Sequence, residues 1–313
     1  MPREQKSEQI SSRPPPGTGD EPLVSSVQQV AAGMRRGTVR SIHYTLSFAT
    51  QNPERGPQGA IVLLHDFPGG AFVWVRVLPE LAATGRAVYA FDLLGYGLSS
   101  HPWPSDTSIW GHADCLLYAF QALGLSDVVL VGLGLGGGVA QVLATRLYRE
   151  GVARLALLNS YAYEHAFATG WPLPDMAVYQ DPEMAHHAKV EEVLADLRAT
   201  VPKGSANPPS LDNDRLAAYV DEWNSEVGKQ LLFQHARLLL PVYQNSTASD
   251  LRRLEIPVLI VWGELDTVSP ITLATRLATE ISGARLETIP NAGHLLVDDA
   301  PSAVGALLVD FAQ

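Results

Sequence analysis

Apolar and polar residues alternate around residue 45 of the chain. Ile42, Tyr44, Leu46 and Phe48 are apolar, and the serine, histidine, threonine and serine at positions 41, 43, 45 and 47 are polar. A period of two is typical of a strand with one face buried. The pattern therefore predicts an antiparallel hairpin at one edge of a sheet.

From residue 60 onward the apolar positions form short continuous runs. These runs are AIVLL, AVYAF, VVLV, LALL and VLIV, and helix-sized amphipathic stretches separate most of them. Parallel strands that are buried on both faces have this composition. We therefore expect an α/β fold with a mostly parallel sheet and helices on both faces.

The alternation of strands and helices stops between residues 161 and 250. Helical segments such as PEMAHHAKVEEVLADLRA and RLAAYVDEWNSEV follow one another there without an intervening strand,. We interpret 161–250 as a helical cap inserted into a core made of 23–160 and 251–313. Residues 1–22 are rich in proline, glycine, serine and charge, and we expect them to form a disordered tail,.

Composition narrows the possible partners and compartment. The chain has 33 acidic and 22 basic residues and a net charge of −11, which repels nucleic-acid phosphates and anionic lipid surfaces,. Its single cysteine, Cys115, excludes an internal disulfide framework and a cysteine-rich zinc site,. The first residues lack the apolar stretch of a signal peptide, and no apolar run of about 20 residues is present,. We expect a cytoplasmic protein with no nucleic-acid or membrane partner.

Four segments, in order and spacing, resemble the α/β-hydrolase family. They are LLHDFPGGAFVW at 63–74, FDLLGYGLSS at 91–100, VGLGLGGGVAQ at 131–141, and the pair PVLIVWGELDTVSP and IPNAGHLLVDDAP near the end. The resemblance implies the α/β-hydrolase fold. In the first segment it implies that the backbone N–H of Phe67 donates to an oxyanion. Asp66 occupies a position where the family usually has glycine, and the second segment is expected to be architectural.

The third segment resembles the nucleophile elbow, a strand-to-helix turn with the pattern Gly-x-Ser-x-Gly. Gly132 and Gly136 occupy the flanking positions, but Gly134 occupies the position of the serine. Glycine satisfies the strained backbone of an elbow and supplies no nucleophile. The resemblance implies that the N–H of Leu135 is the second oxyanion donor.

The fourth segment supplies a histidine and an acid. The resemblance places the acid at Asp266 and the histidine at His294, just beyond the last strands. A carboxylate that accepts from one imidazole nitrogen fixes the tautomer and leaves the other nitrogen to face the site. We expect Asp266 and His294 to form a hydrogen-bonded pair, with Gly134 near the other nitrogen.

Other residues are candidates for a dinucleotide site, for the nucleophile or for the wall of a pocket. GLGLGG also matches a dinucleotide-binding fingerprint, but the next strand ends in Asn159 and Ser160 and not in a ribose-binding acid,. Ser99, Ser100 and Ser160 lie near strand ends, yet none sits in an elbow. Six residues of the cap segment are candidates for lining a pocket, although such side chains more often only pack: Tyr161, Tyr163, His165, Trp171, Tyr219 and Trp223.

No metal or cofactor site is expected. Glu191 with Glu192 and Asp298 with Asp299 have no histidine partners at ligand spacing, so we assign both acidic pairs to solvated faces,. Cys115 falls in a helical pattern and is expected to be a small buried residue. The expected ligand is a small, largely apolar molecule, and the oligomeric state is left open.

Three hypotheses about function follow from the missing hydroxyl. The first is a hydrolase of the serine type, for esters, lactones or thioesters, in which Gly134 has replaced the nucleophile naturally or by engineering; Gly134→Ser should then restore ester hydrolysis. The second is a non-covalent lyase, cyclase or hydratase that uses His294 and Asp266 for proton transfer, with room at Gly134 for water or substrate. The third is a binding or regulatory protein on a hydrolase scaffold, as in the N-myc downstream-regulated family, which also has glycine at the elbow.

Overall fold

The computed structural model describes residues 35–147, 151–163, 171–173, 175–239 and 250–313. Within these ranges the chain forms one eight-stranded sheet with the strand order β1-β2-β4-β3-β5-β6-β7-β8. The predicted disordered tail, 1–22, lies outside the described residues. Among the described residues, no helix is both long and apolar enough to cross a membrane.

The first two strands form the predicted hairpin at the edge of the sheet. β1 (Arg35–Ser41) and β2 (Tyr44–Gln51) are antiparallel, and β2 also pairs antiparallel with β4. Ile42 lies in the turn and is exposed, so the alternation did not continue through it. All residues from Leu46 to Thr50 of β2 are buried, so both faces of this strand are covered there and the prediction of a single buried face was wrong.

Six strands run parallel in the centre and at the far edge. They are β3 (Ile61–Leu64), β4 (Val88–Phe91), β5 (Val128–Leu133), β6 (Val152–Leu158), β7 (Val258–Gly263) and β8 (Arg285–Ile289). Every residue of β3, β4, β5 and β7 is buried, as expected for strands with both faces covered,. The predicted α/β-hydrolase fold class is confirmed.

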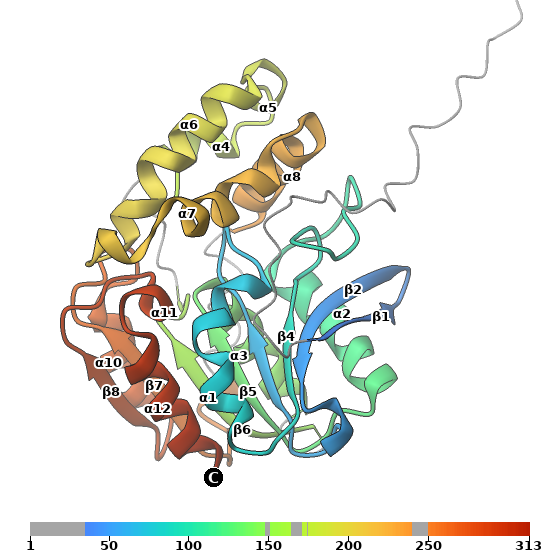
Figure 1. The fold of residues 1–313 in the computed structure, drawn as a ribbon, viewed down its shortest axis with the longest axis vertical. Helices are drawn as coiled ribbons and strands as arrows, with labels where there is room; N and C mark the ends of the chain where they lie inside the picture. Colours follow the sequence, from blue (N-terminus) through green and yellow to red (C-terminus); the bar gives the residue numbers. More distant parts are fainter. Residues whose placement is uncertain (1–34, 148–150, 164–170, 174, 240–249) are drawn as a thin grey trace, which may run out of the picture.

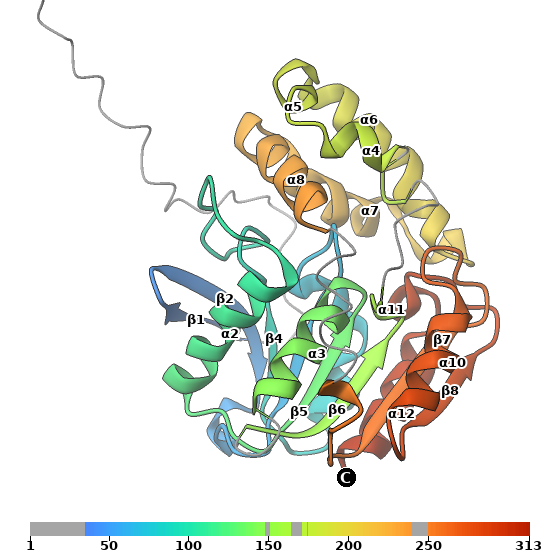
Figure 2. The same cartoon turned by 180° about the vertical axis from the view of Figure 1, so that it is seen from behind.

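Helices cover both faces of the sheet (Figures 1 and 2). α1 (Leu78–Ala82) and α12 (Pro301–Ala312) cover one face, and α2 (Ile109–Leu123) and α3 (Leu135–Leu147) cover the other. α10 (Ile271–Glu280) packs on β7 and β8, and α11 (Leu296–Asp299) is a single turn before α12. Ser108 caps the start of α2 by accepting from the N–H of Gly111,.

The helices of the segment predicted to be a cap gather beyond one end of the sheet, on the side of α11 (Figure 1). They are α4 (Met176–Gln180), α5 (Met184–His187), α6 (Val190–Thr200), α7 (Asn213–Val220) and α8 (Glu226–Leu238). Asp212 and Ser225 cap α7 and α8 with side-chain oxygens,. The exact boundaries 161–250 stay a prediction, since part of that range lies outside the described residues.

Candidate active site

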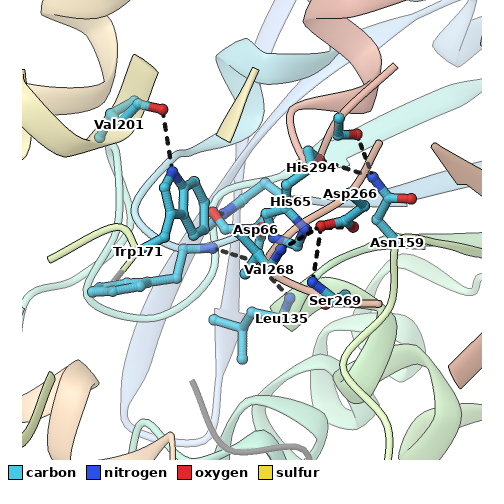
Figure 3. A network of polar contacts seen from close by, with 12 residues as sticks. His65, Asp66, Leu135, Asn159, Trp171, Val201, Asp266, Val268, Ser269 and His294 are labelled. Atoms are coloured by element: carbon cyan, nitrogen blue, oxygen red, sulfur yellow. Dashed lines mark hydrogen bonds and ion pairs between the residues drawn. The ribbon is translucent and has the colours of Figure 1, made fainter. Parts of the chain in front are cut away.

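Loops that follow four parallel strands bring Asp66, Leu135, Asp266 and His294 together (Figure 3), and Gly134, the residue before Leu135, lies beside Asp66. The loops follow β3, β5, β7 and β8, and the carboxyl ends of these strands meet at the same edge of the sheet,. At this edge, hydrogen bonds and ion pairs connect the residues predicted from the sequence.

Asp266 is fixed so that one carboxylate oxygen faces His294. Its Oδ1 accepts from the backbone N–H groups of Val268 and Ser269, each at 2.8 Å. Its Oδ2 lies 2.8 Å from Nδ1 of His294. Both side chains are buried, so the imidazole has one defined orientation.

Asn159 holds the backbone of the histidine loop. From the end of β6 its amide donates to the carbonyls of Gly293 and His294 at 2.8 and 3.0 Å, and its Oδ1 accepts from the N–H of Gly263 at 2.9 Å. Asn159 therefore ties β6, β7 and the His294 loop into one unit. In the sequence, Asn159 counted only against dinucleotide binding, and no pattern predicted its role in holding this loop.

Asp66 reaches into the site from the loop after β3. Its Oδ1 accepts from the N–H groups of Phe67 at 2.8 Å and Leu135 at 2.6 Å, the two predicted oxyanion donors. Its Oδ2 lies 2.9 Å from Nε2 of His294, an ion-pair distance without hydrogen-bond alignment. A carboxylate of the chain itself thus accepts from both N–H groups that the resemblance predicts to bind a substrate oxyanion.

Gly134 and Asp66 depend on each other sterically. Gly134 has φ +51°, a left-handed conformation that favours glycine,. A Cβ at this position would lie 2.0 Å from Cγ of Asp66, far inside van der Waals contact. The expectation of free room for water or substrate at Gly134 was wrong, because the Asp66 carboxylate fills the space that an elbow side chain would take.

His294 lies between two carboxylates that favour its protonated form. Burial disfavours its charge, but Asp266 and Asp66 together outweigh burial and raise its pKa to about 10,. Tyr161 stacks on the imidazole at 6.0 Å between ring centroids, and Trp171 meets it edge-on at 4.6 Å. At neutral pH His294 therefore carries a proton in the resting site and is no free base.

Two of the predicted pocket residues contact His294, and Tyr163 does not. Tyr161 and Trp171 contact His294, and burial followed by the nearby Asp66 raises the pKa of Tyr161 well above its usual range. Tyr163 points elsewhere: its hydroxyl donates to Glu280 and its ring lies under Arg276.

Tyr219 and Trp223 pack between the helices of 175–239 and the loops that follow β3 and β4. The hydroxyl of Tyr219 donates to Asp298, and the indole N–H of Trp223 donates to the carbonyl of Tyr219. His165 lies outside the described residues.

Asp298 and Asp299 were wrongly assigned to a solvated face. Asp298 is buried and pairs with Arg215, whose Nε lies 2.5 Å away. Asp299 accepts from the N–H groups of Ala206 and Gly293, each at 2.8 Å. Both carboxylates therefore join the helical segment to the loop that carries His294. Glu191 and Glu192 are exposed, as expected.

None of the three serines considered from the sequence contacts His294. Ser99 donates to the carbonyl of Asp92 at 2.6 Å, and Ser100 accepts from the N–H of Thr45. Ser160 donates to the carbonyl of Tyr161 and accepts from Gln141. These contacts are structural. Cys115 is buried.

A buried group of imidazoles and aromatic rings contacts His65, the residue before Asp66, and no pattern in the sequence predicted it. Tyr96 stacks on His235 at 4.2 Å and lies 6.0 Å from His112, measured between ring centroids. Burial lowers the pKa of His112 to about 3, so this ring is neutral. Among the described residues no cluster of histidine, cysteine, aspartate or glutamate has the arrangement of a metal site.

The chain belongs to the α/β-hydrolase fold family, whose model matches residues 59–301. It is 26% identical over 260 residues to the 2-hydroxymuconate semialdehyde hydrolase of Pseudomonas sp. (strain CF600), over 80% of this chain and 86% of that protein. It is 25% identical over 296 residues to the monoacylglycerol lipase ABHD6 of Bos taurus, over 89% and 82% of the two chains. An α/β-hydrolase fold protein from Burkholderia ambifaria superposes with a TM-score of 0.78 at 25% identity, over 88% of this chain and 97% of that one.

Proposed function

We propose that the protein is a hydrolase of a small, largely apolar molecule, with Asp66, His294 and Asp266 as its catalytic centre. The observation that carries this proposal is the position of His294, which lies between the two carboxylates at 2.8 and 2.9 Å. Burying three ionisable side chains together costs desolvation free energy, and strongly perturbed pKa values concentrate at functional sites. Hydrolases among the curated relatives agree with it.

The hypothesis of a serine-type hydrolase that has lost its nucleophile is the second candidate. The retained N–H donors of Phe67 and Leu135 favour it, because ester, lactone and thioester hydrolysis all need such donors,. It requires that Asp66 leaves the site first, since its Oδ1 now occupies both donors. The presence of that carboxylate makes this candidate weaker than the first.

The non-covalent and binding-protein hypotheses receive less support. A lyase or hydratase that uses His294 as a base conflicts with the raised pKa of the imidazole in the resting site,. A binding protein without catalytic activity would not need a histidine between two buried aspartates.

The test is hydrolysis by the purified full-length chain over a panel of acyl esters, lactones, epoxides and alkyl halides, followed by proton release. We expect turnover of at least one class and a loss of about 10⁴-fold in kcat for Asp266→Asn, since removing the orienting acid costs this much in other histidine centres. Glu191→Gln, an exposed residue far from the triad in sequence, is the matched control. Turnover that survives His294→Gln, or no turnover of any class, contradicts the proposal.

A further inference from the structure

The two oxygens of the Asp66 carboxylate have different surroundings. Oδ1 accepts from two backbone N–H groups, and one of them belongs to Leu135, the first residue of α3. The positive end of the helix dipole therefore adds to the hold on Oδ1. Oδ2 has no such donors and faces Nε2 of His294 at 2.9 Å. Because no backbone N–H group holds Oδ2, this is the oxygen whose lone pairs can turn from His294 to a substrate.

This arrangement disfavours attack on an acyl carbon. A tetrahedral intermediate at a substrate carbonyl needs donors for its oxyanion, and Asp66 Oδ1 already uses the N–H groups of Phe67 and Leu135,. Displacement at a saturated carbon creates no oxyanion on the substrate and needs no such donors. The geometry thus disfavours acyl substrates, which need both N–H donors, and is compatible with substrates that react at a saturated carbon.

We propose, on the basis of the proposed hydrolase function, that Asp66 Oδ2 is a nucleophile that forms an alkyl ester at a saturated carbon bearing a leaving group that departs as an anion. An alkyl halide is the simplest such substrate. In the first step the Oδ2–carbon bond forms while the carbon–halogen bond breaks, and the halide takes the bonding electron pair. No proton, oxidant or further reactant is needed in this step.

The second step returns the carboxylate. The ester has no charge, so His294 loses one of the two carboxylates that raise its pKa and releases its proton to solvent,. The neutral imidazole then takes a proton from water as the water oxygen attacks Cγ of Asp66. The oxyanion develops on Oδ1, which the N–H groups of Phe67 and Leu135 already hold. Collapse breaks the Cγ–Oδ2 bond, the alcohol leaves with Oδ2 after proton transfer from His294, and a second proton transfer from the new carboxyl group restores the imidazolium.

The origin of the alcohol oxygen tests this sequence directly. With the unmodified chain in excess over 1-bromobutane in H₂¹⁸O, the first turnover should give butanol without label and place one ¹⁸O on the peptide that carries Asp66. Water attacking the substrate directly would give labelled butanol and an unlabelled Asp66, and would overturn the proposal.

A trapped intermediate is the independent measurement. His294→Gln removes the base of the second step, so the butyl ester should accumulate on Asp66 and add one butyl group by peptide mass, whereas the Asp66→Asn/His294→Gln variant should stay unmodified. Styrene oxide and p-nitrophenyl butyrate are the comparison probes. The absence of any butyl adduct at Asp66 would show that Asp66 is not the nucleophile.

The outcomes separate this inference from the proposed function. Hydrolysis of p-nitrophenyl butyrate alone, dependent on His294 and Asp266, would keep the hydrolase and overturn the alkyl ester. An adduct from styrene oxide without one from 1-bromobutane would overturn the class of leaving group. Turnover that does not depend on His294 contradicts the proposed function itself.

Discussion

Two buried aspartates, Asp66 and Asp298, carry the main polar clusters at this end of the molecule. Asp66 is 4% exposed and Asp298 is 2% exposed, so burial alone does not distinguish them. Asp298 pairs with Arg215 at 2.5 Å and accepts from the hydroxyl of Tyr219 at 2.7 Å. Asp66 pairs with His294 and with two backbone N–H groups.

The partner decides what each carboxylate can do. Burial disfavours the charge of Arg215, but Asp298 holds its pKa above the usual value, so the guanidinium never gives up a proton,. Arg215 also donates to the carbonyls of Phe72 and Val73, and the cluster therefore joins α7 to the sheet domain. An imidazole can exchange its proton, and the same kind of carboxylate beside it becomes part of a chemical centre.

The largest expected effect separates the two carboxylates by activity. Asp66→Asn should lower kcat/KM of the proposed hydrolysis by at least about 10⁴-fold, comparable with the loss of a triad member in other hydrolases. The amide keeps the shape and removes the charge, so the pKa of His294 should fall as well. Steady-state kinetics and NMR of the imidazole measure the two effects. Unchanged kinetics in a variant whose imidazole pKa has fallen would show that Asp66 only tunes the histidine.

The structural pair should respond in stability. Arg215→Met leaves Asp298 buried with only the more distant Arg76, whose Nη1 lies 3.6 Å from Oδ1, and the loss of the close buried partner costs up to about 3 to 5 kcal/mol of the free energy of unfolding,. Urea denaturation measures the loss. Lys189→Gln, which breaks the solvent-exposed Lys189–Glu192 pair, is the control and should change the free energy of unfolding far less than Arg215→Met does, because solvent screens exposed ion pairs,. Equal losses in both variants would contradict the comparison.

Gly134→Ser should not restore a serine hydrolase by itself, contrary to the first expectation from the sequence. Its Cβ would overlap the Asp66 carboxylate, so we expect a destabilised protein without esterase activity,. Asp66→Gly/Gly134→Ser removes the overlap and frees both N–H donors, and it should hydrolyse p-nitrophenyl butyrate.

A double-mutant cycle over Asp66→Gly, Gly134→Ser and their combination measures the coupling of the two sites. The interaction energy in stability should be on the order of 1 to 3 kcal/mol, as for residues in direct contact. Additive effects would mean that Asp66 leaves the site easily.

Alkaline pH should distinguish the two ion pairs. The pKa of His294 is raised to about 10 in the folded protein, above the ordinary value of 6.5. The stability that it contributes is therefore complete below pH 6.5 and is lost as the pH rises through 10. His294→Gln should remove this part of the pH dependence, whereas Arg215→Met should retain it. A titration of His294 near pH 6.5 would contradict the charged triad.

Acid pH tests the buried neutral imidazoles, where we expect the smallest effect. The pKa of His112 is lowered to about 3, so the unfolded chain binds a proton here that the folded chain excludes between pH 6.5 and 3. Stability should fall as the pH decreases through this window, and His112→Leu should reduce the slope. Thermal unfolding from pH 7 to pH 4 measures the dependence of stability on pH. Equal slopes of stability against pH in the unmodified chain and in His112→Leu would show that other groups control the loss of stability in acid.

Local patterns were enough to predict the order of strands and helices along the chain and to show glycine at the position where the elbow pattern has a nucleophile. These features are local: continuous apolar runs mark buried strands, and Gly134 can be read directly from the elbow pattern,. The resemblance also indicated Asp266 and His294, which the structure places 2.8 Å apart. Asp66 was noticed only as a departure from the usual glycine.

The contacts of the Asp66 carboxylate, in contrast, could be seen only in the folded chain. Asp66 and Leu135 are 69 residues apart, and no local pattern shows that a side chain of one loop fills the space left by another. The same holds for Asp298, which finds Arg215 at a separation of 83 residues and is buried although its local pattern suggested exposure. A charged side chain can be buried when a distant partner is brought to it, and that partner is fixed by the packing of the whole chain.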